Sequence, residues 1–206
     1  MRGYKTIARP ALAEHVEKRS RFLCLAAPLT CEEEAIALLE EARAQHREAG
    51  HNCYAYILRT GNRQRYSDDG EPSGTAGMPI LEVLRRRALL DVMVIVTRYF
   101  GGVLLGAGGL VRAYSTGAAL ALDAAEVVEM HPCILFSVEA AYHHYGKLQN
   151  LFAAFEIQSL EEDFGETIRL RLRIRAERFS AFQKELLELS AGGILPTLLE
   201  EVLAPD

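Results

Sequence analysis

The stretch Tyr66–Leu81, with the sequence YSDDGEPSGTAGMPIL, combines carboxylates, glycines and hydroxyl groups at a density that suggests a site. In an extended segment, residues i and i+2 point to the same side. On this spacing Asp69 and Glu71 should converge, while Asp68 should point away. Two converging carboxylates can hold Mg²⁺ through water and a phosphate ligand, or they can bind arginine side chains across a cleft.

The same stretch also has a structural interpretation, which we prefer. The run Asp68–Pro72 favours a turn, and Gly74 and Gly77 provide backbone freedom. In this interpretation the carboxylates accept hydrogen bonds from loop amides, and Thr75 caps the helix that follows. We therefore expect a structured loop with no bound metal or cofactor.

A second stretch, Thr97–Ser115 (TRYFGGVLLGAGGLVRAYS), places a glycine-rich turn between a strand and a helix. A turn that leads into a helix N-terminus can bind an anion. The common phosphate motifs do not match, because Val111 replaces the third glycine of G-x-G-x-x-G and a P-loop lysine is missing. Arg98 and Arg112 either face an anion or pair with the carboxylates of the Asp68–Glu71 turn, and both alternatives stay open.

Motifs of nucleophilic or metal-dependent hydrolysis are missing, since G-x-S-x-G, S-x-x-K and H-E-x-x-H do not occur. His51 and Cys53 lie two residues apart, which places both on one face of a strand. One such pair is a weak metal signal, so we interpret His51 as a buried or rim histidine, and we expect His51 and Arg21 to lie next to the cleft. The sequence favours a protein without catalytic activity.

The segment Arg169–Arg175 (RLRLRIR) alternates arginine with leucine and isoleucine. With a strand period of two, its arginines share one face and its apolar residues the other. The arginine face either binds RNA phosphates or pairs with Glu139, Glu161 and Glu162 of neighbouring strands. The residues assigned to nucleic-acid binding are Arg169, Arg171, Arg173 and Arg175.

The composition is typical of a globular protein in a reducing compartment. Of the 206 residues, 50% are apolar and 25% are charged, and the net charge of −5 argues against coating nucleic acid through bulk charge. The four cysteines form no C-x-x-C pair, which is typical of reduced thiols. No secretory h-region and no apolar run of about 18 residues occurs, so we expect a cytoplasmic protein that does not bind membranes.

Hydrophobic patterns predict the elements that must position these residues. In the first part of the chain, strands are expected over 4–7, 16–27, 51–58 and 91–100, and helices over 30–50, 79–87 and from 110 onward. The helix over 30–50 should begin with a capping box of Thr30 and Glu33 and end at Gly50. A hairpin should turn at Gly61–Asn62.

The pattern is interrupted at His131–Pro132, which we take as the boundary between domains 1–131 and 132–206. The second domain is expected to run strand 134–140, helix 146–155, strands 157–160 and 167–175, helix 177–189 and strand 195–202. This βαββαβ order is that of a ferredoxin-like plait.

The motifs SDDGEPSGTAGMPIL and VTRYFGGVLLGAGGLVRAYS resemble the signature of the YigZ/IMPACT family. The blocks SRF, at Ser20–Phe22, and HNCYAY, from His51, support the resemblance, which covers about residues 4–126. It implies an α+β fold with two domains. The first would be similar to domain IV of elongation factor G and to a ribosomal-protein domain, and the second would be ferredoxin-like. Some members carry lysine where this chain has Leu104, so a cation is not implied there.

Eukaryotic members of that family regulate translation by binding a partner of a stress-activated kinase, and the family brings no established reaction. We therefore predict a non-catalytic, translation-associated protein that binds RNA, the ribosome or a translation-regulatory protein. One alternative is an enzyme that acts on a phosphorylated or nucleotide-like small molecule in the glycine-rich cleft, and another is a module that docks a peptide on the Tyr66–Leu81 stretch. The predicted cleft residues are Arg21, His51, Asp68, Asp69, Gly70, Glu71, Thr75, Arg98, Gly101, Gly102, Gly108, Gly109 and Arg112.

Overall fold

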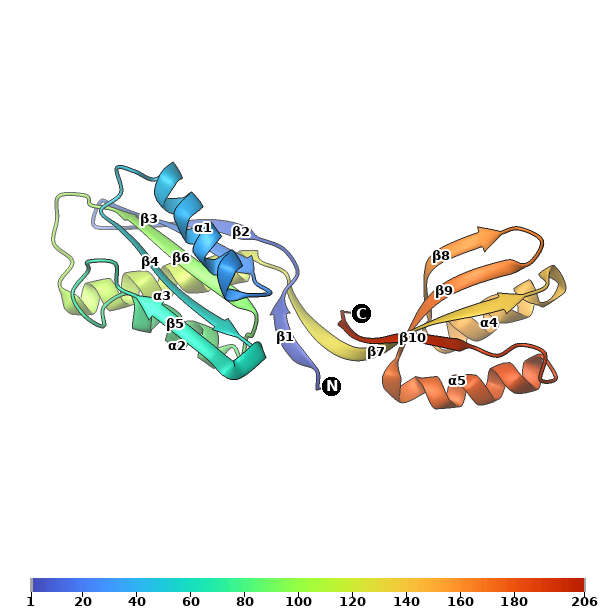
Figure 1. Ribbon diagram of the computed structural model, residues 1–206. Coiled ribbons are helices and arrows are strands. Elements are labelled where there is room, and N and C mark those ends of the chain that lie inside the picture. Colours follow the sequence, from blue (N-terminus) through green and yellow to red (C-terminus); the bar gives the residue numbers. More distant parts are fainter. Residues whose placement is uncertain (1, 206) are drawn as a thin grey trace. The chain divides into compact units, whose positions relative to one another are not determined.

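The computed structural model describes residues 2–205, and the chain forms two compact units (Figure 1). The first unit is Tyr4–Glu129, and the second comprises the described residues from Met130 onward together with residues 2–3. Each unit packs helices on a sheet, so the predicted two-domain α+β fold is confirmed. No helix among residues 2–205 is both long and apolar enough to cross a membrane.

The first unit is built on a five-stranded antiparallel sheet with the order β2-β3-β6-β4-β5. These strands are β2 (Ala11–Glu17), β3 (Ser20–Pro28), β6 (Val92–Tyr99), β4 (His51–Leu58) and β5 (Arg63–Ser67), with the 3₁₀ turn η1 (Thr60–Asn62) before β5. Strand β6 lies in the middle and is buried from Val92 to Arg98. Its unbroken apolar run fits this position, because helices cover both faces of the sheet.

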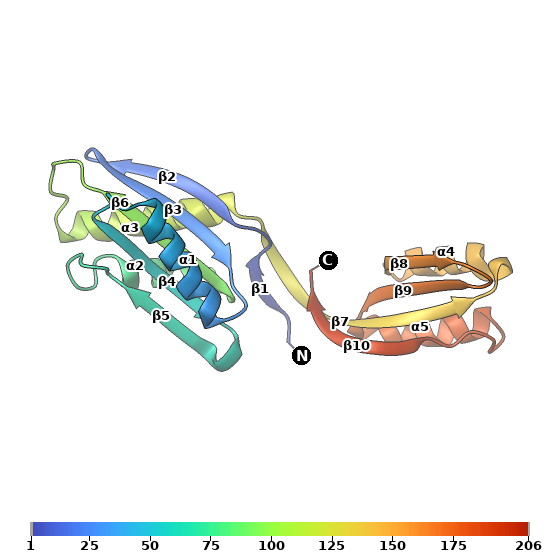
Figure 2. The same ribbon diagram turned by 45° about the horizontal axis from the view of Figure 1, so that its top comes forward.

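Helices α2 (Gly77–Arg86) and α3 (Ala107–Ala124) cover one face, and α1 (Glu32–Gln45) lies on the other (Figure 2). The backbone of α3 approaches β3 closely at Gly117, where an added Cβ would lie 2.5 Å from the Cys24 sulfur. Only glycine permits this packing distance. The middle of α3 is therefore held close to the sheet.

Three local predictions in this unit are wrong. The expected single strand over 16–27 is a hairpin, because Lys18 and Arg19 take positive φ angles of 45° and 67° and reverse the chain between β2 and β3. The capping box is not formed, since the Thr30 amide and hydroxyl bind Glu34, at 2.6 and 2.8 Å, instead of Glu33. Helix α1 also ends at Gln45 rather than at residue 50.

The second unit has the predicted βαββαβ order, with the sheet order β10-β7-β9-β8. Its elements are β7 (Val127–Ala140), η2 (Tyr142–His144), α4 (Tyr145–Ala154), β8 (Gln158–Phe164), β9 (Ile168–Arg175), α5 (Ala176–Leu189) and β10 (Thr197–Ala204). Strand β7 begins in the first unit, where β1 (Tyr4–Ile7) also lies, and β1 pairs with β7. His131 and Pro132 do not interrupt β7, because both pair with β10 in extended backbone.

Candidate functional site

The Asp68 carboxylate caps helix α2. It accepts hydrogen bonds from the amides of Gly74, Ala76 and Gly77 at 2.8, 3.0 and 2.8 Å. The prediction that Thr75 caps this helix is therefore wrong, and the Thr75 hydroxyl instead donates to the Pro72 carbonyl at 2.6 Å. An aspartate that binds several amides at a helix start removes donors that would otherwise lack a partner.

Asp69 and Glu71 do not converge, contrary to the extended geometry assumed from the sequence. Asp69 has a φ of 42° and Gly70 a φ of 88°, so the chain turns between the two carboxylates. The Asp69 carboxylate binds the Asn52 amide at 2.7 Å and the Arg43 guanidinium at 2.8 Å. Glu71 points elsewhere, into the interior of the unit.

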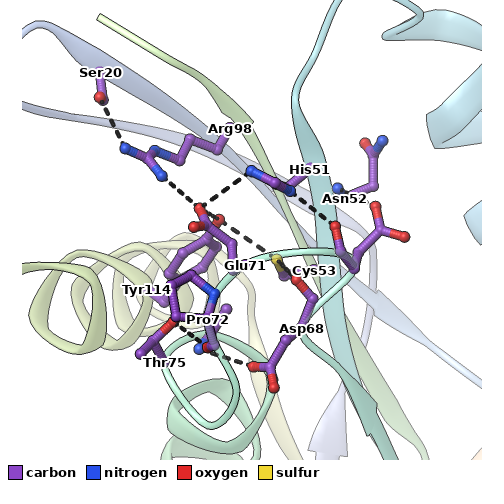
Figure 3. A network of polar contacts seen from close by, with 12 residues as sticks. Ser20, His51, Asn52, Cys53, Asp68, Glu71, Pro72, Thr75, Arg98 and Tyr114 are labelled. Carbon is purple, nitrogen blue, oxygen red and sulfur yellow. Dashed lines mark hydrogen bonds and ion pairs between the residues drawn. The ribbon is translucent and has the colours of Figure 1, made fainter. Parts of the chain in front are cut away.

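Glu71 and Arg98 form a buried ion pair at 2.6 Å, with only 8% and 6% of the two residues exposed (Figure 3). The Tyr114 hydroxyl donates to the same Glu71 oxygen at 2.8 Å, and Arg98 donates to the Ser20 hydroxyl at 3.4 Å. Burial raises the pKa of the Tyr114 hydroxyl, so this group stays neutral and keeps donating. Of the two alternatives for Arg98, the structure adopts pairing with a loop carboxylate.

His51 is held in one orientation beside this pair. Its Nδ1 lies 2.8 Å from the Asp69 carbonyl, which only accepts, so Nδ1 carries the proton. Its Nε2 lies 3.9 Å from the Glu71 carboxylate (Figure 3). The neighbouring Cys53 thiol donates to the Asp68 carbonyl at 2.9 Å, and burial raises its pKa to about 12.

His51 and Cys53 thus hold the backbone of the loop and do not share a ligand. Within residues 2–205, no three or more His, Cys, Asp or Glu residues are placed together as metal ligands. The three carboxylates of the loop, Asp68, Asp69 and Glu71, are each bound by groups of the protein itself.

A cavity of about 420 Å³ opens next to the ion pair, and we call it the His51 cavity. Four predicted cleft residues line it: His51, Gly70, Glu71 and Arg98. The other lining residues are mainly apolar and were not predicted: Gly50, Pro72, Phe100, Leu104, Leu105, Gly106, Ala107 and Leu110. The sequence signal for these lining residues is the apolar content of the turn between β6 and α3, whose glycines alone led to the prediction of an anion site.

The turn between β6 and α3 exposes apolar side chains at the rim of the His51 cavity. Phe100 is 58% exposed and Leu104 is 82% exposed, with Val103 at 40%. The turn is held at Gly101, whose amide donates to the Ser20 hydroxyl at 3.2 Å and whose added Cβ would lie 2.1 Å from the Arg19 backbone. This segment therefore presents large apolar groups to solvent on a fixed backbone.

The remaining predicted cleft residues do not line the cavity. Arg21 binds Glu14 at 2.9 Å, and Arg112 lies near His15 and Lys18 in a separate hollow of about 180 Å³. Their positions on β3 and α3 point them away from the ion pair. The side chains or backbone of the other predicted members serve the loop and the start of α3: Asp68, Asp69, Thr75, Gly101, Gly102, Gly108 and Gly109.

The arginines of β9 lie on the face of their sheet opposite the buried leucines, as the alternation predicts. They alternate in space with acidic residues. Arg169 lies 3.6 Å from Glu139, and Arg171 is paired in register with Glu161. Glu162 is in register with Leu170 and therefore lies on the other face, so it does not pair with this stripe.

Arg173 donates to the Gln158 side chain and to the Pro205 carbonyl. The stripe is therefore already hydrogen-bonded and partly neutralised. This arrangement favours the interpretation in which the arginines pair with their neighbours. Binding of RNA phosphates by these residues stays a prediction.

Comparison with known proteins places both units in one family. The model of the Impact N-terminal domain matches residues 18–122, and the model of a domain of unknown function, DUF1949, matches residues 138–192. The IMPACT family member YvyE of Bacillus subtilis is 36% identical over 193 residues, covering 93% of this chain and 89% of that protein. The chain belongs to the IMPACT family.

Other relatives from the IMPACT family match different shares of the chain. YigZ of Escherichia coli is 31% identical over 98% of this chain and 100% of its own length. Protein IMPACT of Bos taurus is 34% identical over 44% of this chain, and the match covers 30% of that protein. A crystal structure of a hypothetical protein matches 97% of this chain and 98% of its own, at 30% identity and a TM-score of 0.62.

The IMPACT match spans every residue that lines the His51 cavity, from Gly50 to Leu110. It also spans the Glu71–Arg98 pair and the capped loop. The β9 arginines fall within the second matched domain. Both candidate surfaces therefore belong to the parts of the chain that the family shares.

Proposed function

We propose that the protein is a cytoplasmic, non-catalytic binding protein of the translation apparatus, and that the His51 cavity is where its partner docks. The partner is RNA, the ribosome or a translation-regulatory protein. The family membership supports the link to translation, because the signature motifs resemble those of members that regulate it. The structure supports the choice of binding over catalysis.

The observation that carries this choice is that all three loop carboxylates are bound by groups of the protein itself. Asp68 caps α2, Asp69 binds an amide and a guanidinium, and Glu71 is paired with Arg98 and Tyr114. A general base or metal ligand needs a free lone pair directed at the substrate. The alternative of an enzyme acting on a phosphorylated small molecule relied on Asp69 or Glu71 for that role, and their contacts argue against it.

The exposed apolar side chains support docking of a partner. Phe100, Val103 and Leu104 are all at least 40% exposed and lie together on one short turn. Clustered apolar side chains on a surface are typical of interaction sites, and buried aromatic anchors carry much of the binding energy in interfaces. The β9 arginines would add contacts that do not depend on sequence, if RNA is part of the partner.

The test is co-sedimentation with ribosomes near physiological salt. We expect the wild-type chain to pellet and Leu104→Glu to lose at least about 1 kcal/mol of binding, since a charge would be buried in an apolar contact. Leu195→Glu is the matched control, because Leu195 is 68% exposed and lies in the second unit. The proposal fails if the wild-type chain does not pellet, or if both variants pellet like it.

A further inference from the structure

The first turn of α3 opens into the His51 cavity without a capping side chain. Its N-cap residue is Gly106, with a φ of 71°, and its first turn contains no acidic residue. By contrast, α1 begins with three glutamates and α2 is capped by Asp68. The amides of the first turn, from Ala107 to Gly109, have no intrahelical acceptor and carry the positive end of the helix dipole. Gly106 and Ala107 form part of the cavity wall.

A second, independent feature of the same cavity is a buried donor without an acceptor. Arg98 is only 6% exposed and forms part of the cavity wall. Its Nε is buried and makes no hydrogen bond with any residue in the range 2–205. The Phe100 ring lies 5.5 Å from the guanidinium carbon, at the rim of the cavity. Arg98 therefore keeps, in the cavity wall, one buried donor that no described residue satisfies.

The charge of the cavity selects the kind of anion. Arg98 is the one cationic side chain among the lining residues, and Glu71 neutralises it at 2.6 Å. Among the partners named in the proposed function, the cavity therefore favours a protein, because nucleic acid needs several exposed lysines or arginines to replace its counterions and the lining residues include none. A single carboxylate can instead be bound by the backbone amides and the dipole of a helix N-terminus, without a cationic side chain.

The apolar walls of the cavity indicate which chemical group carries the carboxylate. Leu104, Leu105 and Leu110 line the cavity together with Pro72 and Phe100. These walls accept an aliphatic or aromatic side chain, and the volume of about 420 Å³ lies within the usual range of ligand sites. The ligand should therefore carry an apolar group next to a carboxylate.

We propose that the His51 cavity binds the C-terminal carboxylate of a protein partner whose last residue is apolar. The carboxylate accepts a hydrogen bond from the Ala107 amide in the cavity wall and is attracted by the positive end of the α3 dipole, and the last side chain packs against Leu104 and Leu110. Capture of chain ends by backbone amides is a known mode of peptide recognition. The exposed turn at Leu104 then contacts residues that precede the chain end, which a free carboxylic acid lacks. This inference rests on the proposed function and names the partner chemistry of that site.

The test uses the full chain labelled with ¹⁵N and four hexapeptides that end in Leu, Val, Ile or Phe. We expect at least one peptide with a free carboxylate to bind and to shift the amide resonances of Ala107, Gly108 and Gly109. The same peptide with a C-terminal amide should bind about tenfold more weakly, because it lacks the charge that the helix dipole attracts.

A pair of matched variants locates the site. Gly108→Asp adds a negative charge to the first turn of α3, where an added Cβ meets no atom within 4 Å. It should weaken binding of the free-carboxylate peptide about tenfold or more through repulsion. Gly146→Asp places the same residue in the first turn of α4, where space is equally free, and should leave the affinity unchanged.

Several results would overturn the proposal: no binding of any peptide, equal binding of acid and amide, or binding of 4-methylpentanoate with no binding of the peptides. If no peptide binds, only the peptide proposal fails, provided that Leu104→Glu still weakens ribosome co-sedimentation and Leu195→Glu does not. The proposed function then stands. If the wild-type chain neither pellets with ribosomes nor binds a peptide, both proposals fail.

Discussion

The Arg98 guanidinium donates to the Glu71 carboxylate at 2.6 Å, and both residues are more than nine-tenths buried. This pair joins the centre of the β sheet, on β6, to the loop that begins at the end of β5. A buried ion pair contributes little net stability compared with an apolar pair, but loss of one partner is costly because the other charge stays buried. The pair therefore fixes where the loop lies.

Replacement of Glu71 should test this coupling. Glu71→Gln leaves the Arg98 charge without its counterion, and we expect the free energy of unfolding to fall by about 3–5 kcal/mol. Urea denaturation followed by circular dichroism measures it. Arg98→Met in the Glu71→Gln background should restore part of the loss, because the unpaired buried charge is then absent. Additive effects of the two substitutions would contradict the coupling.

The cap on α2 predicts an order of stabilities among three loop variants. Asp68→Ala removes the acceptor of three amides and should cost about 1–2 kcal/mol. Asp68→Asn keeps an acceptor and should cost less. Thr75→Ala is the control, because the Thr75 hydroxyl donates to the Pro72 carbonyl within the turn instead of capping α2. If Thr75→Ala is as damaging as Asp68→Ala, the assignment of the cap to Asp68 is wrong.

Strands β6 and β9 were predictable from the sequence, whereas the β2–β3 hairpin and the loop were not. An unbroken apolar run predicts a strand buried on both faces, as in β6. Alternation of apolar and charged residues predicts a strand buried on one face, as in β9. The positions of Asp68 and Asp69 depend instead on which backbone amides each carboxylate reaches, and that is set by positive φ angles at Asp69 and Gly70. Hydrophobic periodicity in the sequence does not predict these φ angles.

The apolar wall of the His51 cavity was missed for a different reason. Apolar residues in a sequence are assigned to the core, yet Phe100 and Leu104 are 58% and 82% exposed. Only the structure shows that a turn held by Gly101 directs them outward. The arginines that the sequence emphasised, Arg21 and Arg112, lie outside the cavity because they are on surfaces that point elsewhere.

The buried thiols should respond to pH in a defined direction. Burial raises the pKa of Cys53 from 9.0 to about 12, and does the same for Cys24. The folded state holds these protons more tightly than the unfolded chain, so their stabilising contribution is complete below about pH 9 and is lost as the pH rises through about 12. Stability should fall above pH 9, and less steeply in Cys53→Ala.

Alkylation gives a separate measurement of the same property. At pH 8 iodoacetamide should label Cys24 and Cys53 far more slowly in the folded protein than in urea, because the thiolate is the reactive form. Peptide mass spectrometry identifies the labelled positions. Equal rates in the folded and unfolded chain would contradict the burial of the two thiols, which is the cause of their raised pKa.

The β9 stripe should bind weakly and with strong salt dependence if RNA is its ligand. Changing Arg169, Arg171, Arg173 and Arg175 together to Gln should reduce ribosome co-sedimentation at low salt, because counterion release is lost. The effect should shrink near physiological salt, where a stripe already paired with Glu139 contributes little. An unchanged pellet at low salt would restrict the contact to the first unit.

The turn between β6 and α3 offers a last comparison, between two adjacent glycines with different constraints. At Gly101 an added Cβ would lie 2.1 Å from the Arg19 backbone, whereas at Gly102 it meets no atom within 4 Å. Gly102 has a φ of 80°, so Gly102→Ala should cost about 1 kcal/mol through backbone strain alone. Gly101→Ala has no such φ strain but must displace the β2–β3 turn, and we expect a loss of about 2–3 kcal/mol or more. Because Gly101 also sets the position of Phe100, this variant should bind its partner more weakly than Gly102→Ala at a temperature where both are folded. Urea denaturation and co-sedimentation measure the two effects, and equal losses in both variants would show that the contact with Arg19 does not hold the turn.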